Sequence, residues 1–91
     1  MQARISDITR LMEKMFPLSL AEAWDNPGLQ IGSLSAPATR VLVTLDLDRE
    51  TLGCARAQKA DMIITHHPLF FTGLRTINLD TALGSMVKEL I

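Results

Sequence analysis

The sequence predicts an α/β fold, a three-layer sandwich-like arrangement built on a βαβ unit. Two short runs of mainly apolar, often β-branched residues, 41–47 and 62–65, are typical of strands in a parallel sheet. Residues 49–60 between them are compatible with a helix, and amphipathic patterns near both ends of the chain predict further helices. Strand, helix and strand in succession predict a right-handed crossover, which places the carboxyl ends of both strands on the same edge.

The first predicted element is an amphipathic helix. Its apolar residues recur at spacings of three and four, namely Ile5, Ile8, Leu11, Met12, Met15 and Phe16. Either Ser6 or Asp7 can cap this helix, and Pro17 ends it.

Capping and turn signals predict the structure of residues 19–32. Ser19 and Glu22 fit a capping box, which predicts a short helical turn over residues 21–24. Asn-Pro-Gly at 26–28 predicts a turn, and the alternation over residues 29–32 suits an edge strand.

The run 41–47 is the clearest strand, and its nearly continuous apolar character predicts cover on both faces. Asp48 can cap the helix that follows, although Gly53 weakens the helical pattern. Cys54 lies within this helix, where we expect a small buried residue rather than a reactive thiol.

The last predicted element is a helix with Asp80 as its N-cap. Its apolar stripe consists of Leu83, Met86, Val87, Leu90 and Ile91. The stripe reaches the last residue without a stop signal, so we interpret residues 1–91 as a single amino-terminal segment of a longer protein; a helix that ends naturally at the carboxyl terminus is the alternative. We therefore expect this stripe to be exposed in the segment alone, and its apolar surface to favour self-association.

Composition excludes several classes of protein. Ninety-one residues make at most one domain, and a net charge of −1 provides no basic field, so nucleic-acid binding is not expected. No apolar run is long enough to span a membrane, and the single cysteine cannot form an internal disulfide, so we expect a cytoplasmic protein. The sequence contains neither a Gly-x-Ser-x-Gly elbow nor a glycine-rich phosphate loop, and catalytic residues are not identified.

The candidate chemical site is the pair His66 and His67, at the carboxyl end of the second strand and followed by Pro68. That edge of an open α/β sheet is where ligands bind. Successive residues of an extended strand point to opposite faces, so the two rings suit two ions, or one ligand and one supporting residue, better than one shared ion. Spacing alone leaves two alternatives open: metal ligation, or a hydrogen-bonded structural histidine.

Several residues could support this pair. Asp46, Asp48 and Asp25 are the carboxylates that the fold could bring near it, although none has a diagnostic spacing. Asp25 and Asn26 fit a turn-forming role better than a site role. Trp24 could be a recognition aromatic, but a tryptophan beside a turn in a small domain is more often part of the core.

Three stretches together carry a family resemblance. They are AEAWDNPGLQIG at residues 21–32, Leu45 with Asp46, and ADMIITHHPLFF at residues 60–71. In order and spacing they resemble the amino-terminal part of the GTP cyclohydrolase I type 2 homologue family, the NIF-three-like proteins. The family usually has Val where Pro27 stands, a departure in a loop.

The resemblance implies an α/β fold with a dinuclear divalent-metal site, in which His66 and His67 each supply a ligand. Asp46, Asp25 and Asn26 would then be candidates to contact the metal-binding histidines without binding the ions themselves. Two ions per full-length subunit are implied, and zinc, iron, manganese and nickel are not distinguished. The family's remaining ligands, an Asp, a His and a Glu, would lie beyond Ile91.

The resemblance also implies a homo-oligomer, specifically a homohexamer. Two functions follow as hypotheses: a metal-dependent hydrolase that acts with metal-activated water on an unknown small-molecule substrate, or a non-enzymatic oligomeric interaction or scaffold protein with structural metal.

Overall fold

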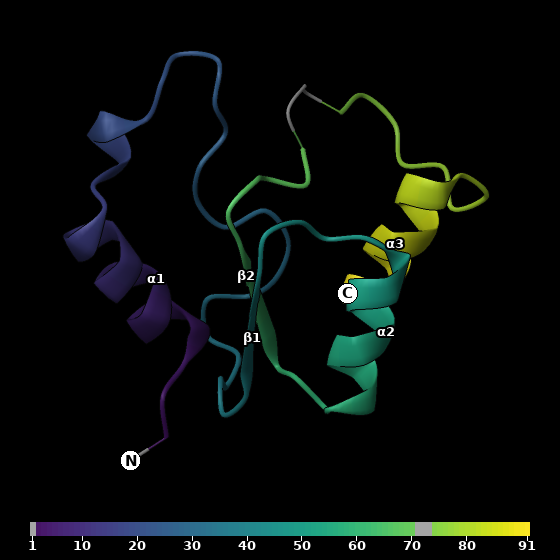
Figure 1. Cartoon of the computed structure of the whole chain (residues 1–91), viewed down its shortest axis with the longest axis horizontal. Helices are drawn as coiled ribbons and strands as arrows, with labels where there is room; N and C mark the ends of the chain where they lie inside the picture. The colour runs from purple at the N-terminus through teal and green to yellow at the C-terminus, as the bar shows by residue number, and fades with distance from the viewer. Residues whose placement is uncertain (1, 71–73) are drawn as a thin grey trace.

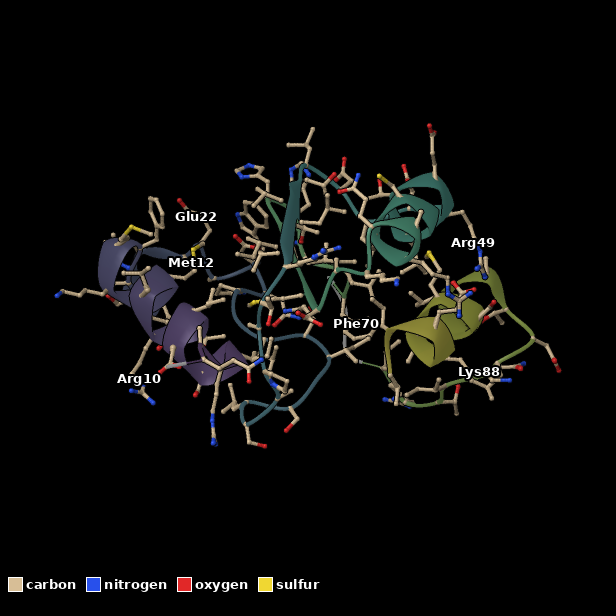
Figure 2. The ribbon with its side chains drawn as sticks, turned by 90° about the horizontal axis from the view of Figure 1, so that it is seen from below. Arg10, Met12, Glu22, Arg49, Phe70 and Lys88 are labelled. Atoms are coloured by element: carbon tan, nitrogen blue, oxygen red, sulfur yellow. The ribbon has the colours of Figure 1, made fainter. Side chains whose placement is uncertain are left out.

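The computed structural model describes residues 2–70 and 74–91, and it has the predicted α/β fold. Its elements in order are α1 (Ile5–Met15), the 3-10 helix η1 (Leu18–Leu20), β1 (Val41–Thr44), α2 (Arg49–Ala57), β2 (Met62–Thr65) and α3 (Ala82–Leu90). The strand pair lies in the middle, with α1 on one side and α2 and α3 on the other (Figure 1). Figure 2 shows the same division from below, with Arg10 and Met12 on the α1 side and Arg49 and Lys88 on the opposite side. No helix within the described ranges is long and apolar enough to cross a bilayer.

The βαβ unit is confirmed by the pairing of its strands. β1 and β2 are parallel neighbours, in a register that runs from Val41 opposite Met62 to Thr44 opposite Thr65. Between them, Asp48 caps α2 as predicted, because its carboxylate accepts a hydrogen bond of 2.7 Å from the Thr51 backbone N–H. The helix ends at Ala57 rather than at residue 60.

Asp61 fixes the amino-terminal edge of this strand pair. Its Oδ2 accepts hydrogen bonds from the backbone N–H groups of Thr39 (2.8 Å) and Arg40 (3.0 Å). Its own N–H donates to the Arg40 carbonyl at 2.8 Å. The two N–H donors, that of Arg40 first, hold the pKa of the Asp61 carboxyl below its ordinary value.

The expectation that the first strand is covered on both faces is wrong. β1 ends at Thr44 rather than at residue 47, and its side chains alternate between exposed and half-buried. Val43 is 71% exposed and Leu45 is 61% exposed, so within the described residues only one face of β1 is packed. Apolar runs report which residues prefer burial, whereas cover depends on which elements lie opposite them.

α1 begins at Ile5, before both predicted caps, Ser6 and Asp7. Arg4 is the N-cap residue, and Asp7 accepts a hydrogen bond of 2.8 Å from the Arg4 backbone N–H. The start is set by a tertiary contact, since the Ile5 N–H donates to the Ala36 carbonyl at 2.9 Å. Ile5 and Ala38 are buried at this junction.

The segment between α1 and β1 departs most from prediction. The expected helical turn at 21–24 is replaced by η1, and residues 29–32 form no strand. Gly28 and Gly32 have φ values of 104° and 137°, conformations that other residues rarely adopt and that interrupt extended pairing. Trp24 is 70% exposed, so its expected place in the core is also wrong.

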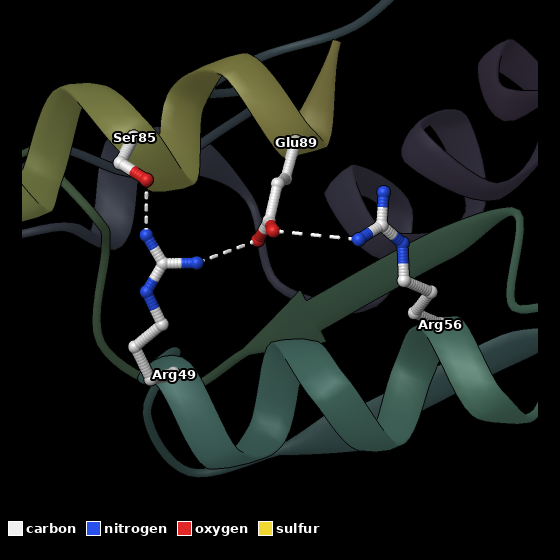
Figure 3. A network of polar contacts seen from close by, with 4 residues as sticks. All are labelled: Arg49, Arg56, Ser85 and Glu89. Carbon is white, nitrogen blue, oxygen red and sulfur yellow. Dashed lines mark hydrogen bonds and ion pairs between the residues drawn. The ribbon is translucent and has the colours of Figure 1, made fainter. Parts of the chain in front are cut away.

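α3 packs against α2, which overturns the expectation of an exposed apolar stripe. Val87 is only 2% exposed, and of the predicted stripe Ile91 alone is exposed, at 88%. Glu89 joins the two helices through ion pairs with Arg49 (2.9 Å) and Arg56 (3.4 Å), as Figure 3 shows.

Two smaller expectations on these helices are also wrong. Thr81, not Asp80, caps α3, because the Thr81 hydroxyl accepts a hydrogen bond from the Gly84 backbone N–H at 3.0 Å. Cys54 is exposed rather than buried, because α2 turns Leu52 and Ala55 inward instead.

Candidate metal centre

His66 and His67 directly follow β2, at the edge that the sequence predicted. The main chain holds them there, because the His66 N–H lies 3.2 Å from the Thr44 carbonyl and 3.1 Å from that of Leu45. The His67 N–H donates to the Leu45 carbonyl at 3.2 Å. The pair is thus fixed to the end of β1 as well as to β2.

The two imidazole rings lie in an edge-to-face contact, with centroids 4.7 Å apart and planes at 66°. Both residues are exposed. The expectation of rings on opposite faces assumed that the strand continues through the pair, whereas β2 ends at Thr65. Beyond the strand the alternation of side chains no longer applies, and the rings lie together.

Asp46 is the carboxylate that the fold brings to the pair. It follows β1, and its Oδ1 lies 2.7 Å from His67 Nδ1. A carboxylate accepts a hydrogen bond from the protonated Nδ1, which favours the tautomer whose lone pair is on Nε2. Metal-ligating histidines commonly have such a partner on the other ring nitrogen. Because the two side chains are 49% and 58% exposed, the contact orients the ring more than it stabilises the fold.

Asp48, the alternative carboxylate, has a structural role instead. It caps α2, and its hydrogen bonds with Thr51 lower the pKa of its carboxyl. Across residues 2–70 and 74–91, no three or more His, Cys, Asp and Glu side chains gather into a group that could hold a metal ion. The described residues therefore provide two imidazoles and one supporting carboxylate, which is an incomplete ligand set.

The turn at 25–30 comes close to the histidine loop through Asn26. Its side-chain Nδ2 donates to the Phe70 carbonyl at 2.6 Å and to Gln30 Oε1 at 3.1 Å. Asp25 instead stays local, since its Oδ1 accepts the Asn26 backbone N–H at 2.8 Å. Gln30 was not singled out from the sequence, where nothing marks a contact between residues 40 positions apart.

A shallow, open depression lies beside these groups. Its walls are Asp46, Leu47, His67, Pro68 and Leu69. The depression therefore combines the Asp46–His67 pair with an apolar rim of Leu47, Pro68 and Leu69. It lies at the strand ends, where α/β proteins bind ligands.

Comparisons with known proteins show which proteins the chain resembles. The family described as Duf34/NIF3 (NGG1p interacting factor 3) matches residues 3–91. The chain is 38% identical over 88 residues to a Clostridium perfringens protein named GTP cyclohydrolase 1 type 2 homolog, covering 97% of this chain and 34% of that protein. It is 36% identical over 90 residues to a Helicobacter pylori protein named GTP cyclohydrolase 1 type 2, covering 98% of this chain and 36% of that one.

Solved structures show the same relationship. A Bacillus cereus protein related to NIF3 superposes with a TM-score of 0.91 at 38% identity, over 99% of this chain and 25% of its own. Reduced HcgD from Methanocaldococcus jannaschii superposes with a TM-score of 0.88 at 26% identity, over 99% of this chain and 36% of its own. The chain spans about a third of the length of the two curated relatives named above.

Proposed function

The chain belongs to the Duf34/NIF3 family, and on that premise we propose that His66 and His67 are ligands of a dinuclear divalent-metal site in the full-length protein. The observation that carries the proposal is the arrangement at the strand ends. Two exposed imidazoles lie together after β2, and the carboxylate of Asp46, just beyond the end of β1, contacts one of them at 2.7 Å.

The residues present fit such a site as part of its ligand set. Imidazole nitrogens suit zinc, iron and nickel, and carboxylates add manganese to the candidates, so the metal is not distinguished. Structural zinc sites use four ligands and catalytic ones at least three, which is more than the two histidines provide. We propose that the remaining ligands come from parts of the full-length protein outside residues 1–91, and that Asp46 accepts a hydrogen bond from His67 Nδ1 rather than binding an ion itself.

Each of the chain's own groups has a defined part in this proposal. The backbone contacts to Thr44 and Leu45 hold both rings at the sheet edge. Asp46 fixes the orientation and tautomer of His67, which favours ligation through Nε2. A pair of bound divalent ions would supply an activated water and polarise a substrate bond.

The proposed activity is metal-dependent hydrolysis of a small molecule. The names of the relatives support this class, because a GTP cyclohydrolase opens a ring with water. The depression beside His67 is shallow and open, and we propose that other parts of the full-length protein complete the substrate-binding surface. The substrate itself stays unassigned, and we propose the cytoplasm as the location.

Metal analysis of the full-length protein tests the ligand assignment. The double variant His66→Ala, His67→Ala should lose bound metal, whereas the double variant Glu13→Ala, Lys14→Ala, at two exposed positions of α1, should retain it. Equal metal content in the wild type and both double variants would refute the assignment.

Calorimetric titration of the 91-residue chain with zinc should show much weaker binding than titration of the full-length protein. Tight binding of two ions by the isolated chain would contradict the incomplete ligand set.

A second function is favoured by a different observation. Large apolar side chains are exposed along the end of α1, η1 and the turn that follows: Leu11, Met15, Phe16, Leu18, Leu20 and Trp24. Exposed apolar surface of this kind commonly marks a protein contact. The alternative is therefore an oligomeric interaction or scaffold protein with structural metal, and a homohexamer is the assembly proposed for either function.

One measurement tests the assembly proposed for both functions, and a second separates the two functions. Sedimentation of the full-length protein with and without Phe16→Asp should show whether the apolar surface supports assembly. A metal-loaded, pure protein that hydrolyses no substrate across nucleotide, cyclic-amide and phosphoester panels would favour the scaffold, whereas turnover that is lost in the histidine double variant would favour the hydrolase.

A further inference from the structure

Two amide side chains join the turn at 25–30 to the loop that follows the histidines. Asn26 Nδ2 donates to the Phe70 carbonyl at 2.6 Å and to Gln30 Oε1 at 3.1 Å. Gln30 Oε1 also accepts the Phe70 backbone N–H at 3.4 Å. Asn26 and Gln30 thereby engage both the N–H and the carbonyl of Phe70, the residue labelled in Figure 2.

Gln30 is itself held in place by the turn. Its Nε2 donates to the Asn26 carbonyl at 3.0 Å and to the Gly28 carbonyl at 3.2 Å. In this orientation each N–H donor faces an acceptor. Rotating the Gln30 amide by 180° would instead place its NH₂ against the Asn26 Nδ2 and the Phe70 N–H, which are both donors. The positive φ of Gly28 gives the turn the shape that these contacts need.

The position of Phe70 makes these contacts relevant to the histidines. The segment 66–70 is fixed at its first two residues by the Leu45 carbonyl, and the Thr65 hydroxyl donates to the His67 carbonyl at 2.6 Å. Pro68 has no N–H to donate, so it cannot anchor the segment in the same way. Asn26 and Gln30 anchor the other end, three residues after His67.

We infer that Asn26 and Gln30 are positioning residues for the histidine pair, because they hold the Phe70 end of the loop 66–70 while Leu45 holds its first two residues. The inference rests on the proposed metal site and deepens it. A turn with only a local structural role would make hydrogen bonds within itself. Asn26 instead binds the Phe70 backbone, 44 residues away. Loss of either amide should let the loop move and misplace the imidazoles, even where the fold is retained.

The test uses the full-length protein and cobalt(II) as the probe ion. Asn26→Ala should weaken cobalt affinity by about 10-fold or more, the usual effect of removing an outer-shell partner, and should change the cobalt absorption spectrum. Gln30→Ala should behave alike. The control is Asn78→Ala, which removes another exposed asparagine, one whose Oδ1 accepts only the Asp80 backbone N–H in the described contacts.

A second readout needs no metal. In the metal-free protein, hydrogen exchange at the Phe70 amide should be faster than in the wild type both in Gln30→Ala, which removes the acceptor of that N–H, and in Asn26→Ala, while exchange in α2 stays unchanged. Thermal unfolding of each variant identifies any that merely fails to fold, and Asn26→Ser then provides a milder change with the same expected direction.

The outcomes separate this inference from the proposed function. If the wild type binds no cobalt, or the histidine double variant binds it equally well, the metal site itself is refuted. If the wild type binds cobalt through the histidines but Asn26→Ala and Gln30→Ala show unchanged affinity, spectrum and Phe70 exchange, the positioning role alone is overturned.

Discussion

Replacing Gly84 by alanine should destabilise the protein, although alanine is normally the better helix former. A Cβ at this position, in the first turn of α3, would lie 1.8 Å from the Asn78 carbonyl oxygen and 2.5 Å from its carbon. The same oxygen accepts hydrogen bonds from the Thr81 N–H (3.1 Å) and the Thr81 hydroxyl (2.8 Å). The loop before α3 therefore packs against the helix where only glycine leaves room.

The expected cost follows from two ways of relieving the clash. If the loop stays in place, overpacking costs about 1–3 kcal/mol. If the Asn78 carbonyl moves away, two hydrogen bonds of about 1 kcal/mol each are lost. Either cost is offset by about 1 kcal/mol of improved helix propensity. We expect a net destabilisation of about 1 kcal/mol, which lowers Tm by about 4–8 °C in a domain of this size.

Gly53→Ala provides the matched control, because a Cβ there would meet nothing within 4 Å. In the middle of α2 and exposed, it should stabilise the protein by about 0.5–1 kcal/mol. Urea unfolding followed by circular dichroism measures both variants. Opposite signs for the same chemical change support the close approach at Gly84. Stabilisation by both substitutions would refute it.

Three further predictions concern the packing and the charges of the fold. Val87→Ala should cost roughly 2 kcal/mol in urea unfolding, because it removes a side chain that is 2% exposed, whereas Ile91→Ala, at 88% exposure, should change little; equal effects would mean that α3 is not packed on α2. The pKa of Asp61 is lowered by its backbone donors, so its carboxylate stabilises the fold above the ordinary carboxyl pKa and this contribution disappears as pH falls below about 4. Asp61→Asn should therefore be less stable than the wild type at neutral pH and nearly equal to it near pH 2, as unfolding midpoints across pH would show. Glu89→Gln should cost less than about 1 kcal/mol, and the difference should shrink in high salt, because the paired arginines are largely exposed; a large loss that salt does not change would contradict this.

The local sequence determined the βαβ unit and the position of the candidate site at its sheet edge. Residues 62–65 form a strand as predicted, and Asp48 caps the helix before it. These features depend on backbone preferences and on the period of apolar residues, which are properties of neighbouring positions. Parallel pairing of the two strands then placed His66, His67 and Asp46 at one edge, as the βαβ pattern implied. The family followed from the residues in the same way, because three spaced stretches together are more specific than any one of them.

Burial could not be predicted in the same way. Trp24, Cys54 and the open face of β1 were all expected to be covered, and all are exposed among the described residues. The α3 stripe was expected to be open, and Val87 is buried. An apolar pattern shows which face prefers to leave water, but the elements that pack against that face are distant in the chain.

Only the tertiary structure decided how the site is supported. The contact between Asp46 and His67, the edge-to-face arrangement of the imidazoles, and the engagement of Phe70 by Asn26 and Gln30 each join residues through geometry that no spacing encodes. Such contacts depend on where strands end and on how loops return beside them. A shift of a single residue in either strand would redirect every side chain at that edge. The sequence therefore indicated where the candidate site lies, and the fold determined which groups support it.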